Sequence, residues 1–363
     1  MASQVYRDML DVMIKRGGSY AGMDIPEFYA LVQELFTPEE AELNNALPRN
    51  PVTAAEIAKE KGKSEAGVAA LLEGMANKGL CVAFRAEGKT YYQAAPFMPG
   101  IFEFQFMGGR ATDRDKKIAG LLHAYKTAYN AVKGEQRISF PMTRVISVDR
   151  KIFVKNAVHT YDQVATYIHK YDPVCVGTCF CRHEAKLRGE DLHGMPVETC
   201  MWFGERAEFA AERLGGRKVS KVEAMKILDK AEEAGLVHMS RNTTEEIDFL
   251  CNCDRWHCGV IQLVLKQPKP GLVFNSGFRP NFDPERCTGC EICVDRCPPG
   301  ALQMSKENVP VVDLDRCFGC GTCAAGCEQE AIVMEPKPGF PEPPKTMKDL
   351  VTALKASAAR PSA

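Results

Sequence analysis

The sequence lacks the features that would place the chain in a membrane or send it across one. No apolar run among its 363 residues approaches the roughly 20 residues that a membrane-spanning helix needs. The N-terminal segment carries Arg7 and Asp8 where a signal peptide needs an apolar core. We therefore expect a cytoplasmic protein without a membrane span.

The sequence also lacks a strong charge excess and any recognisable catalytic motif. The formal net charge is −1, so the overall composition favours neither a nucleic acid nor an acidic protein as partner. We find no phosphate-cradling glycine loop, no flavin motif, and no paired carboxylates or nucleophile–histidine arrangement at an interpretable spacing. No catalytic residue is therefore assigned. The 16 cysteines, in contrast, exceed what packing in a reduced protein requires, which predicts that most of them bind metal.

Eight of these cysteines form two runs with the spacing C-x2-C-x2-C-x3-C. The runs are Cys287, Cys290, Cys293 and Cys297, then Cys317, Cys320, Cys323 and Cys327. This pattern resembles bacterial ferredoxins with two [4Fe–4S] clusters, over roughly residues 277–336. In such ferredoxins the fourth cysteine of each run binds the other run's cluster. The resemblance thus implies one cluster on Cys287, Cys290, Cys293 and Cys327, and a second on Cys317, Cys320, Cys323 and Cys297.

Neither structural zinc nor a disulfide framework accounts well for the two runs. Structural zinc prefers two cysteine pairs with a longer spacer, and a disulfide framework needs an oxidising compartment. Glu328 stands where ferredoxins usually carry Pro, which removes a rigid turn but no ligand. Apolar side chains are expected to pack around the clusters and limit water access. The candidates are Ile292, Val294, Ala301, Leu302, Phe318, Ala324, Ala331 and Ile332.

Residues 24–97 show the pattern of a helix–turn–helix followed by a hairpin. Thr37 and Thr53 each open a capping box, and Ser64 caps a third predicted helix. Two short β-rich pieces then flank Glu87-Gly88, a hairpin turn signal. This order resembles the winged-helix domains of transcription regulators.

The candidate recognition helix offers few groups that would bind nucleic acid. Its outward positions carry Glu65, Ala69, Glu73 and Gly74, and its basic charge is confined to Lys78. Counterion release would therefore contribute little affinity. We expect a protein-docking or dimerisation role for this domain, with a homodimer as one form, and consider nucleic-acid binding the weaker alternative.

A basic connector follows the winged-helix-like domain. Thr112 and Asp115 predict the start of a helix in it. One interpretation is a solvated basic face, and the other is a docking patch for an acidic redox partner. The basic residues are Arg110, Arg114, Lys116, Lys117, Lys126, Lys133, Arg137, Arg144, Arg150, Lys151 and Lys155.

The next region is rich in cysteine and is expected to be mostly helical. Its seven thiols are Cys175, Cys179, Cys181, Cys200, Cys251, Cys253 and Cys258. A C-x-C-R motif, an isolated Cys before Phe-Gly and a C-N-C element resemble the Cys-rich domain of uncharacterised ferredoxin-like proteins from anaerobes. The resemblance is in keeping with an anaerobic setting.

Seven thiols exceed the four that one [4Fe–4S] cluster needs and fall one short of two. We favour at least one further cluster in this region. It would draw on Cys179, Cys181, Cys200 and some of Cys251, Cys253 and Cys258. A zinc site is an alternative, because C-x-C geometry with nearby His also suits tetrahedral ligation.

Two clusters would require a ligand other than Cys, such as His183, His257 or Asp254. We expect Arg182 to neutralise thiolate charge and His183 to donate a hydrogen bond to a ligand. Cys81, in the apolar wing strand, is predicted to be a buried small residue.

The sequence thus predicts an α+β, multidomain protein. Its parts are a winged-helix-like domain (1–100), a basic helical connector (101–159), a Cys-rich metal-binding domain (160–266), a two-cluster ferredoxin domain (271–336) and a Pro-rich tail with a short helix (337–363). Gln267-Pro-Lys-Pro270 is expected to be a stiff linker.

We expect an iron–sulfur electron-transfer protein that relays single electrons to or from a larger oxidoreductase. One alternative is a redox-sensing winged-helix transcription regulator. Another is an enzyme whose middle metal site binds substrate, which leaves enzymatic activity uncertain. The redox partner, the direction of electron flow and the reduction potentials do not follow from the sequence.

Overall fold

The fold is taken from a computed structural model, which describes residues 3–134, 138, 140–148 and 164–358. The chain forms two compact units that alternate along the sequence. The first comprises Met1–Glu135, Gly177–His193 and Ala207–Arg217, and the second Gln136–Val176, Gly194–Arg206 and Lys218–Ala363. Residues 160–266, predicted as one Cys-rich domain, are therefore divided between the two units.

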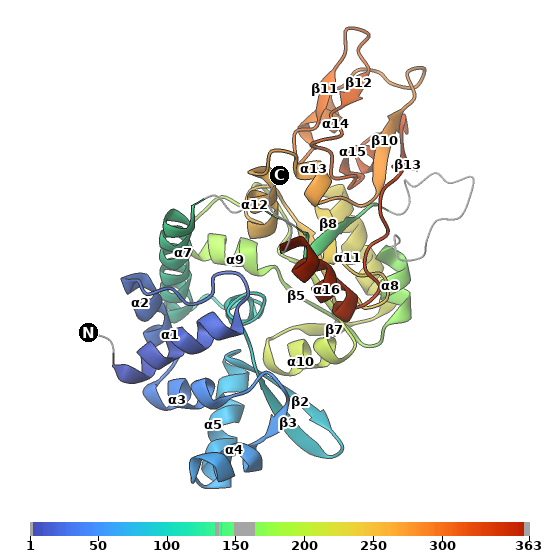
Figure 1. Ribbon diagram of the computed structural model, residues 1–363. Helices are drawn as coiled ribbons and strands as arrows, with labels where there is room; N and C mark the ends of the chain where they lie inside the picture. The colour runs from blue at the N-terminus through green and yellow to red at the C-terminus, as the bar shows by residue number, and fades with distance from the viewer. Residues whose placement is uncertain (1–2, 135–137, 139, 149–163, 359–363) are drawn as a thin grey trace. The chain divides into compact units, whose positions relative to one another are not determined.

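The first unit is mainly helical and carries one small sheet (Figure 1). Its helices are α1 (Gln4–Arg16), α2 (Pro26–Leu35), α3 (Pro38–Ala46), α4 (Ala54–Lys61), α5 (Glu65–Asn77), α6 (Ile101–Phe104), α7 (Asp113–Lys133), α9 (Phe180–Leu187) and most of α10 (Glu205–Arg213). Its strands β1 (Val52–Thr53), β2 (Cys81–Ala86) and β3 (Lys89–Ala94) pair antiparallel in the order β1-β3-β2.

The local signals predicted for this part of the chain are present in the structure. Thr37 and Thr53 each form a complete capping box with the Glu three residues on, and the Ser64 hydroxyl accepts a hydrogen bond from the backbone of Gly67. Glu87 and Gly88 both have positive φ in the turn between β2 and β3, as a two-residue hairpin requires. The predicted helices and hairpin are thus confirmed.

The core of the first unit is aromatic. Four aromatic rings pack together in it, with centroid-to-centroid distances of 4.6 to 6.3 Å between contacting rings: Phe28, Phe97, Phe102 and Tyr125. Cys81 is fully buried, and burial raises the pKa of its thiol to about 12. The prediction that Cys81 is a buried small residue is confirmed.

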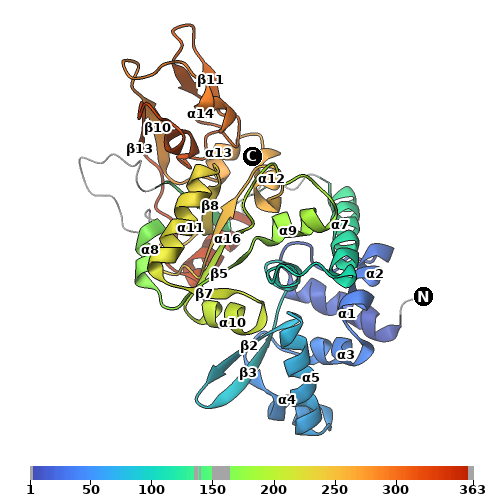
Figure 2. The same cartoon turned by 180° about the vertical axis from the view of Figure 1, so that it is seen from behind.

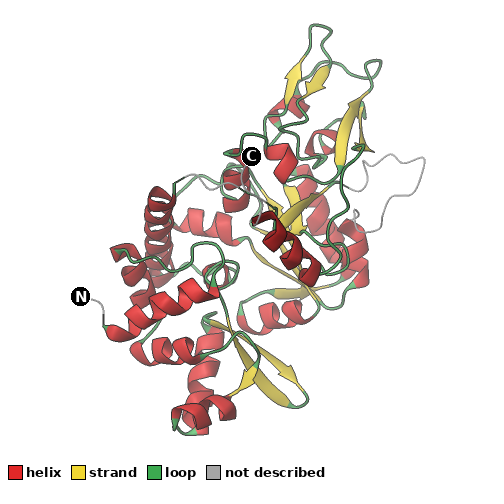
Figure 3. Ribbon diagram, viewed as in Figure 1, coloured by secondary structure: helices red, strands yellow, loops and turns green. Residues whose placement is uncertain are grey.

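The second unit is built on the larger sheet, whose strands are among those drawn in yellow in Figure 3. The strand order of this sheet is β4-β8-β9-β6-β5-β7. The strands are β4 (Thr143–Ile146), β8 (Val237–Arg241), β9 (Phe249–Cys253), β6 (Glu198–Phe203), β5 (Val174–Thr178) and β7 (Arg217–Val219). The predicted Cys-rich region supplies five of these strands, and its described helices contain more residues than its strands, so the sequence indicated the helices but not the sheet. Helix-forming segments in its sequence are conspicuous, whereas the short buried strands carry no alternating pattern.

Opposite faces of this sheet bury different sets of side chains. On one face, Ile146, Val174 and Met201 pack with residues of α8 (Val164–Lys170) and α11 (Lys221–Glu233). Figure 2 shows both helices on this side of the sheet. On the other face, Val145 and Met239 pack with α12 (Gly259–Leu265) and with side chains of the C-terminal module.

The C-terminal module contains two antiparallel strand pairs and two short helices. β10 (Phe278–Phe282) pairs antiparallel with β13 (Ile332–Pro336), and β11 (Leu302–Met304) pairs with β12 (Pro310–Val312). The helices α14 (Ile292–Asp295) and α15 (Thr322–Ala325) each follow the second cysteine of a run and contain its third. The predicted linker adjoins α13 (Pro270–Val273), and Lys269 forms an ion pair with Asp315.

The Pro-rich tail is held against the second unit. Backbone N–H groups of Thr244 and Glu245 donate to the carbonyls of Pro344 and Lys345. The predicted short helix is present as α16 (Met347–Ala358), and its Leu350 is fully buried. The tail is therefore part of the packed unit and not a free tether.

Most described bases of the predicted connector are paired within the protein. Both Arg114 and Lys117 contact Glu34, with a shortest N–O distance of 2.6 Å, and Lys126 contacts Glu184 at 3.2 Å. Arg144 is only 3% exposed in β4. This pairing favours an internally neutralised face over an open docking patch. Arg137, Arg150, Lys151 and Lys155 lie outside the described residues. No helix in the described part of the chain is both long and apolar enough to span a bilayer.

Candidate metal centre

The ferredoxin resemblance implies two sets of four among the cysteines of the C-terminal module, each drawn from both runs. Repulsion from Cys290, Cys287 and Cys327 adds to burial in raising the pKa of Cys293. Burial chiefly raises the pKa of Cys323, and repulsion from Cys320, Cys317, Cys297 and Cys293 also contributes. These effects act mainly within the two sets and, through Cys293, also between them, so the crossed ligation stays a prediction.

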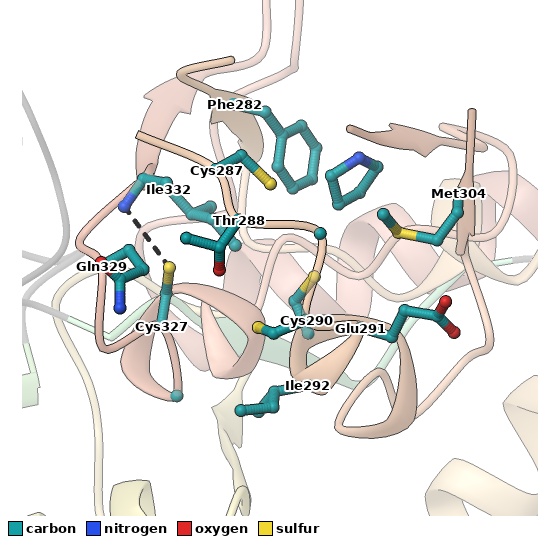
Figure 4. A pocket seen from close by; sticks show the side chains of 15 residues that line it. Phe282, Cys287, Thr288, Cys290, Glu291, Ile292, Met304, Cys327, Gln329 and Ile332 are labelled. Atoms are coloured by element: carbon teal, nitrogen blue, oxygen red, sulfur yellow. Dashed lines mark hydrogen bonds between the residues drawn. The ribbon is translucent and has the colours of Figure 1, made fainter. Parts of the chain in front are cut away.

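The first set, here called the outer set, is Cys287, Cys290, Cys293 and Cys327. These four residues line a single small hollow that is partly open to solvent. Figure 4 shows the sulfur atoms of Cys287, Cys290 and Cys327 around it, with the rings and aliphatic chains of neighbouring residues forming the walls. The Ala331 N–H donates to Cys327 Sγ at 3.4 Å. Cys290 is exposed, so this set lies at the protein surface.

The second set, here called the inner set, is Cys297, Cys317, Cys320 and Cys323, and all four are buried. Burial raises the pKa of Cys297 to about 11 and that of Cys317 to about 12. Three hydrogen-bond contacts reach these sulfurs, from the Ala301 and Gly319 backbones and the Thr322 hydroxyl, at 3.2 to 3.4 Å. Such donors stabilise a reduced cluster because they offset the added negative charge.

The two cysteine runs differ at the positions between their ligands, and these differences decide which set is buried. Thr288, Glu291 and Ile292 of the first run are exposed or partly exposed. The corresponding residues of the second run are Phe318, Gly321 and Thr322, which are buried. Ile292 is 42% exposed and also lines the hollow of the outer set, so its predicted packing against a cluster stays a prediction. The sequence alone does not identify the buried set, because the apolar Ile292 is exposed while the polar Thr322 is buried.

Gly321 shows why the second run cannot be exposed in the same way. Its φ is +81°, and a Cβ atom there would lie 3.1 Å from the backbone N of Val148, just beyond β4. The Val148 N–H also donates to the Cys320 carbonyl. The second run is therefore docked on the edge of the large sheet of its own unit.

Arg296 links the inner set to a helix of the same unit. Its guanidinium donates to the carbonyls of Glu232 and Glu233, at the C-terminal end of α11, and to the Thr322 carbonyl. Burial lowers its pKa, while Cys323 and Cys320 act in the opposite direction. A cation is thus fixed beside the inner thiols.

The seven predicted cysteines of the middle region fall into both units. Cys179 and Cys181 belong to the first unit, where Cys179 precedes α9 and is buried. The other five belong to the second unit and lie on or next to β5, β6, β9 and α12: Cys175, Cys200, Cys251, Cys253 and Cys258. Of these, Cys251 has a strongly raised pKa, chiefly through a hydrogen bond with Cys200, with Cys253 and Cys258 also acting on it.

The other predicted ligands of the middle region make local contacts. His183 Nε2 donates to the Arg110 carbonyl at 2.6 Å. Asp254 Oδ1 accepts from the backbone N–H groups of Trp256 and His257, and the His257 ring lies 3.1 Å away. Arg182 is buried at 1% exposure. His183 and Asp254 thus form hydrogen bonds with backbone groups, and His257 lies beside Asp254.

No three of the His, Cys, Asp and Glu side chains in the described ranges are arranged to chelate one metal ion. The ferredoxin thiols are included in that statement. A [4Fe–4S] cluster makes a different demand, because its four thiolates bind four separate iron atoms.

A family model described as a 4Fe-4S dicluster domain matches residues 286–332. No curated protein and no solved structure matches the chain. The matched residues include all eight cysteines of the two runs. This part of the chain is thus a ferredoxin-type domain with a site for at least one [4Fe–4S] cluster and with iron–sulfur electron-transfer capability.

Proposed function

We propose that the protein is an electron-transfer adaptor with two [4Fe–4S] clusters in residues 271–336, and that it relays single electrons to or from a larger oxidoreductase. The observation that carries this proposal is the difference in burial between the two sets of thiols: the outer set includes the exposed Cys290, whereas all four thiols of the inner set are buried. Each bound cluster would supply a one-electron change of charge, with no bond made or broken in a substrate.

The two sets are suited to different parts of a relay. Exposure of Cys290 brings the outer set to the surface that a redox partner can reach. The inner set is buried, with the Arg296 cation beside it and hydrogen bonds to its sulfurs. Such surroundings would set the reduction potential of a bound cluster. We therefore expect the outer site to exchange electrons with the partner.

The crossed ligand sets can be tested by iron content in single and double variants. Cys297→Ala and Cys317→Ala remove ligands of the same inner site, so each single variant and the double variant should lose about four iron atoms. Cys287→Ala combined with Cys297→Ala should lose about eight, because the two substitutions affect different sites. Iron and acid-labile sulfide would be measured in anaerobically purified protein.

Electron transfer itself is tested by the spectrum of the reduced protein. Dithionite should produce a paramagnetic iron–sulfur signal, and reoxidation by a small one-electron acceptor should remove it. A protein with its full iron content but no reversible signal would contradict the proposed function. Loss of one and the same site on both Cys287→Ala and Cys297→Ala would contradict the crossed ligation alone.

The winged-helix-like domain gives little support to a transcription regulator. On α5, Glu73 accepts a hydrogen bond from Tyr92 and forms an ion pair with Arg213, each at 2.6 Å. Lys78 contacts Glu40 at 2.7 Å. The charged groups of the candidate recognition helix are therefore used within the first unit. We propose protein docking, with a homodimer as one form, as the role of this domain.

A further inference from the structure

Three neighbouring strands of the large sheet carry cysteines on the face opposite α8 and α11. Side chains alternate between the two faces of a strand. Val174 and Val176 of β5 pack on the α11 face, as does Met201 of β6. Cys175 and Cys200, which lie next to them in the sequence, therefore belong to the other face.

The pairing of β6 with β9 brings two of these cysteines opposite each other. Met201 pairs with Leu250 in an antiparallel register. Continuing that register by one residue places Cys200 across from Cys251. The side-chain amide of Asn252 donates to the Thr199 carbonyl, which agrees with this continuation. Cys253 follows two residues after Cys251 and so lies on the same face.

A fourth thiol comes from the turn that follows β9. Cys258 immediately precedes α12 and is 4% exposed, and it belongs to the same buried cluster of side chains as Cys253 and Ile261. The raised pKa of Cys251, caused first by Cys200 and with a contribution from Cys258, agrees with this grouping. The four thiols all come from the second unit.

We propose that Cys200, Cys251, Cys253 and Cys258 bind a further [4Fe–4S] cluster, separate from those of the ferredoxin-type domain. Four cysteine thiolates are the ligand set that such a cluster takes. This assignment makes Cys179 and Cys181 unnecessary as ligands, in contrast to the set that the sequence favoured. The assignment adds a cluster to the proposed electron-transfer function, and the role of that cluster in electron transfer rests on the proposed function.

The proposed site lies close to the inner set, so electrons would pass directly between the two clusters. Phe318 and Cys320 of the ferredoxin-type domain lie in the same buried cluster as Cys253 and Cys258. The rings of Phe274 and Phe318 meet edge to face there, with centroids 5.1 Å apart. The order is therefore outer set, inner set and sheet site. Each step would oxidise the donor cluster by one electron and reduce the acceptor by one, with no atom transferred.

The site is tested by iron content in Cys251→Ala and Cys258→Ala. Anaerobically purified wild type should hold about twelve iron atoms, and each variant about eight. The reduced ferredoxin-type signals should persist in both variants, which shows that the domain still folds. Cys179→Ala, Cys181→Ala and Cys81→Ala are matched controls and should retain the full iron content.

Three outcomes would overturn this inference. Wild-type protein with about eight iron atoms and normal ferredoxin-type signals would leave the sheet site without a cluster. One equivalent of zinc that is lost in Cys251→Ala would identify a zinc site. Loss of about four iron atoms in Cys179→Ala would show that the ligand set is different. Failure of the proposed function is distinguishable, because the ferredoxin-type signals would then be missing as well.

Discussion

Individual side chains between the ligands, more than the ligands themselves, distinguish the two ferredoxin sites. Glu291 and Gly321 occupy the same position in the two runs and both have positive φ. Glu291 faces solvent, whereas Gly321 approaches the backbone of Val148. The repeated cysteine spacing thus supports two sites with different surroundings.

Replacing Gly321 by Ala should therefore destabilise the protein. The left-handed conformation costs Ala about 1 kcal/mol, and the contact with Val148 adds to that cost. Glu291→Ala is the matched control, because Glu and Ala both carry a Cβ and the position is open to solvent; its effect should stay within about 0.5 kcal/mol. Chemical denaturation of both variants measures the difference. Equal effects at the two positions would contradict the docking of the second run.

Arg296 should raise the reduction potential of the inner site. Removing its charge by Arg296→Gln makes an added electron less favourable, and about 1 kcal/mol of lost attraction lowers the potential by roughly 40 mV. Lys306→Gln, an exposed change of the same charge, should shift the potential much less. Redox titration followed by the paramagnetic signal checks this. An unchanged potential in Arg296→Gln would show that its role is limited to joining α11 to the ferredoxin-type domain.

Among the helices, α16 has the clearest energetic role outside the metal sites. The sequence predicted a short helix after the Pro-rich tail, and the structure buries its Leu350 completely. The Met347 N–H donates to Glu246 at 2.7 Å, so the start of the helix is also fixed. A segment that looked like an extension of the chain contributes to the stability of the second unit.

Leu350→Ala should accordingly lower the free energy of unfolding of the second unit by about 2 to 4 kcal/mol, because it leaves a cavity in a packed site. Val351→Ala on the same helix is the control, since Val351 is 40% exposed and should cost less than about 1 kcal/mol. Thermal or denaturant unfolding gives both values. A Leu350→Ala variant as stable as wild type would show that α16 does not pack in solution.

At the scale of the whole molecule, the net charge of −1 provides no excess of bases for nucleic-acid binding. Several bases of α7, and Lys78 just after α5, form ion pairs with nearby carboxylates. Nucleic-acid affinity depends on bases that are free to displace counterions from phosphates. The surface charge therefore agrees with an electron carrier rather than a regulator.

This distinction is open to a direct test with the whole chain. In a mobility-shift assay at low salt, neither the oxidised nor the dithionite-reduced protein should retard a mixed-sequence DNA duplex. Low salt is the most permissive condition, because electrostatic affinity falls steeply as salt is added. Retardation by one redox state alone would instead favour the redox-sensing regulator.

The sequence by itself determined the ferredoxin-type domain, the helix caps and the hairpin. Ligand spacing in C-x2-C-x2-C-x3-C, the capping residues Thr37 and Thr53, and the turn Glu87-Gly88 all act over a few residues. Local geometry of this kind is encoded in neighbouring positions. Domain boundaries and the number of cysteines that bind each cluster depend on distant segments instead. The sequence therefore gives them only as predictions.

Only the tertiary structure decided which thiols are buried and which come together. Cys200 and Cys251 are some fifty positions apart and become neighbours only because β6 pairs with β9. The strands of the middle region were not recognisable in the sequence, because strands buried on both faces lack an alternating pattern of apolar and polar residues. Exposure of the outer set and burial of the inner set likewise follow from what the second run packs against. Such relations arise from long-range packing, which no short stretch of sequence contains.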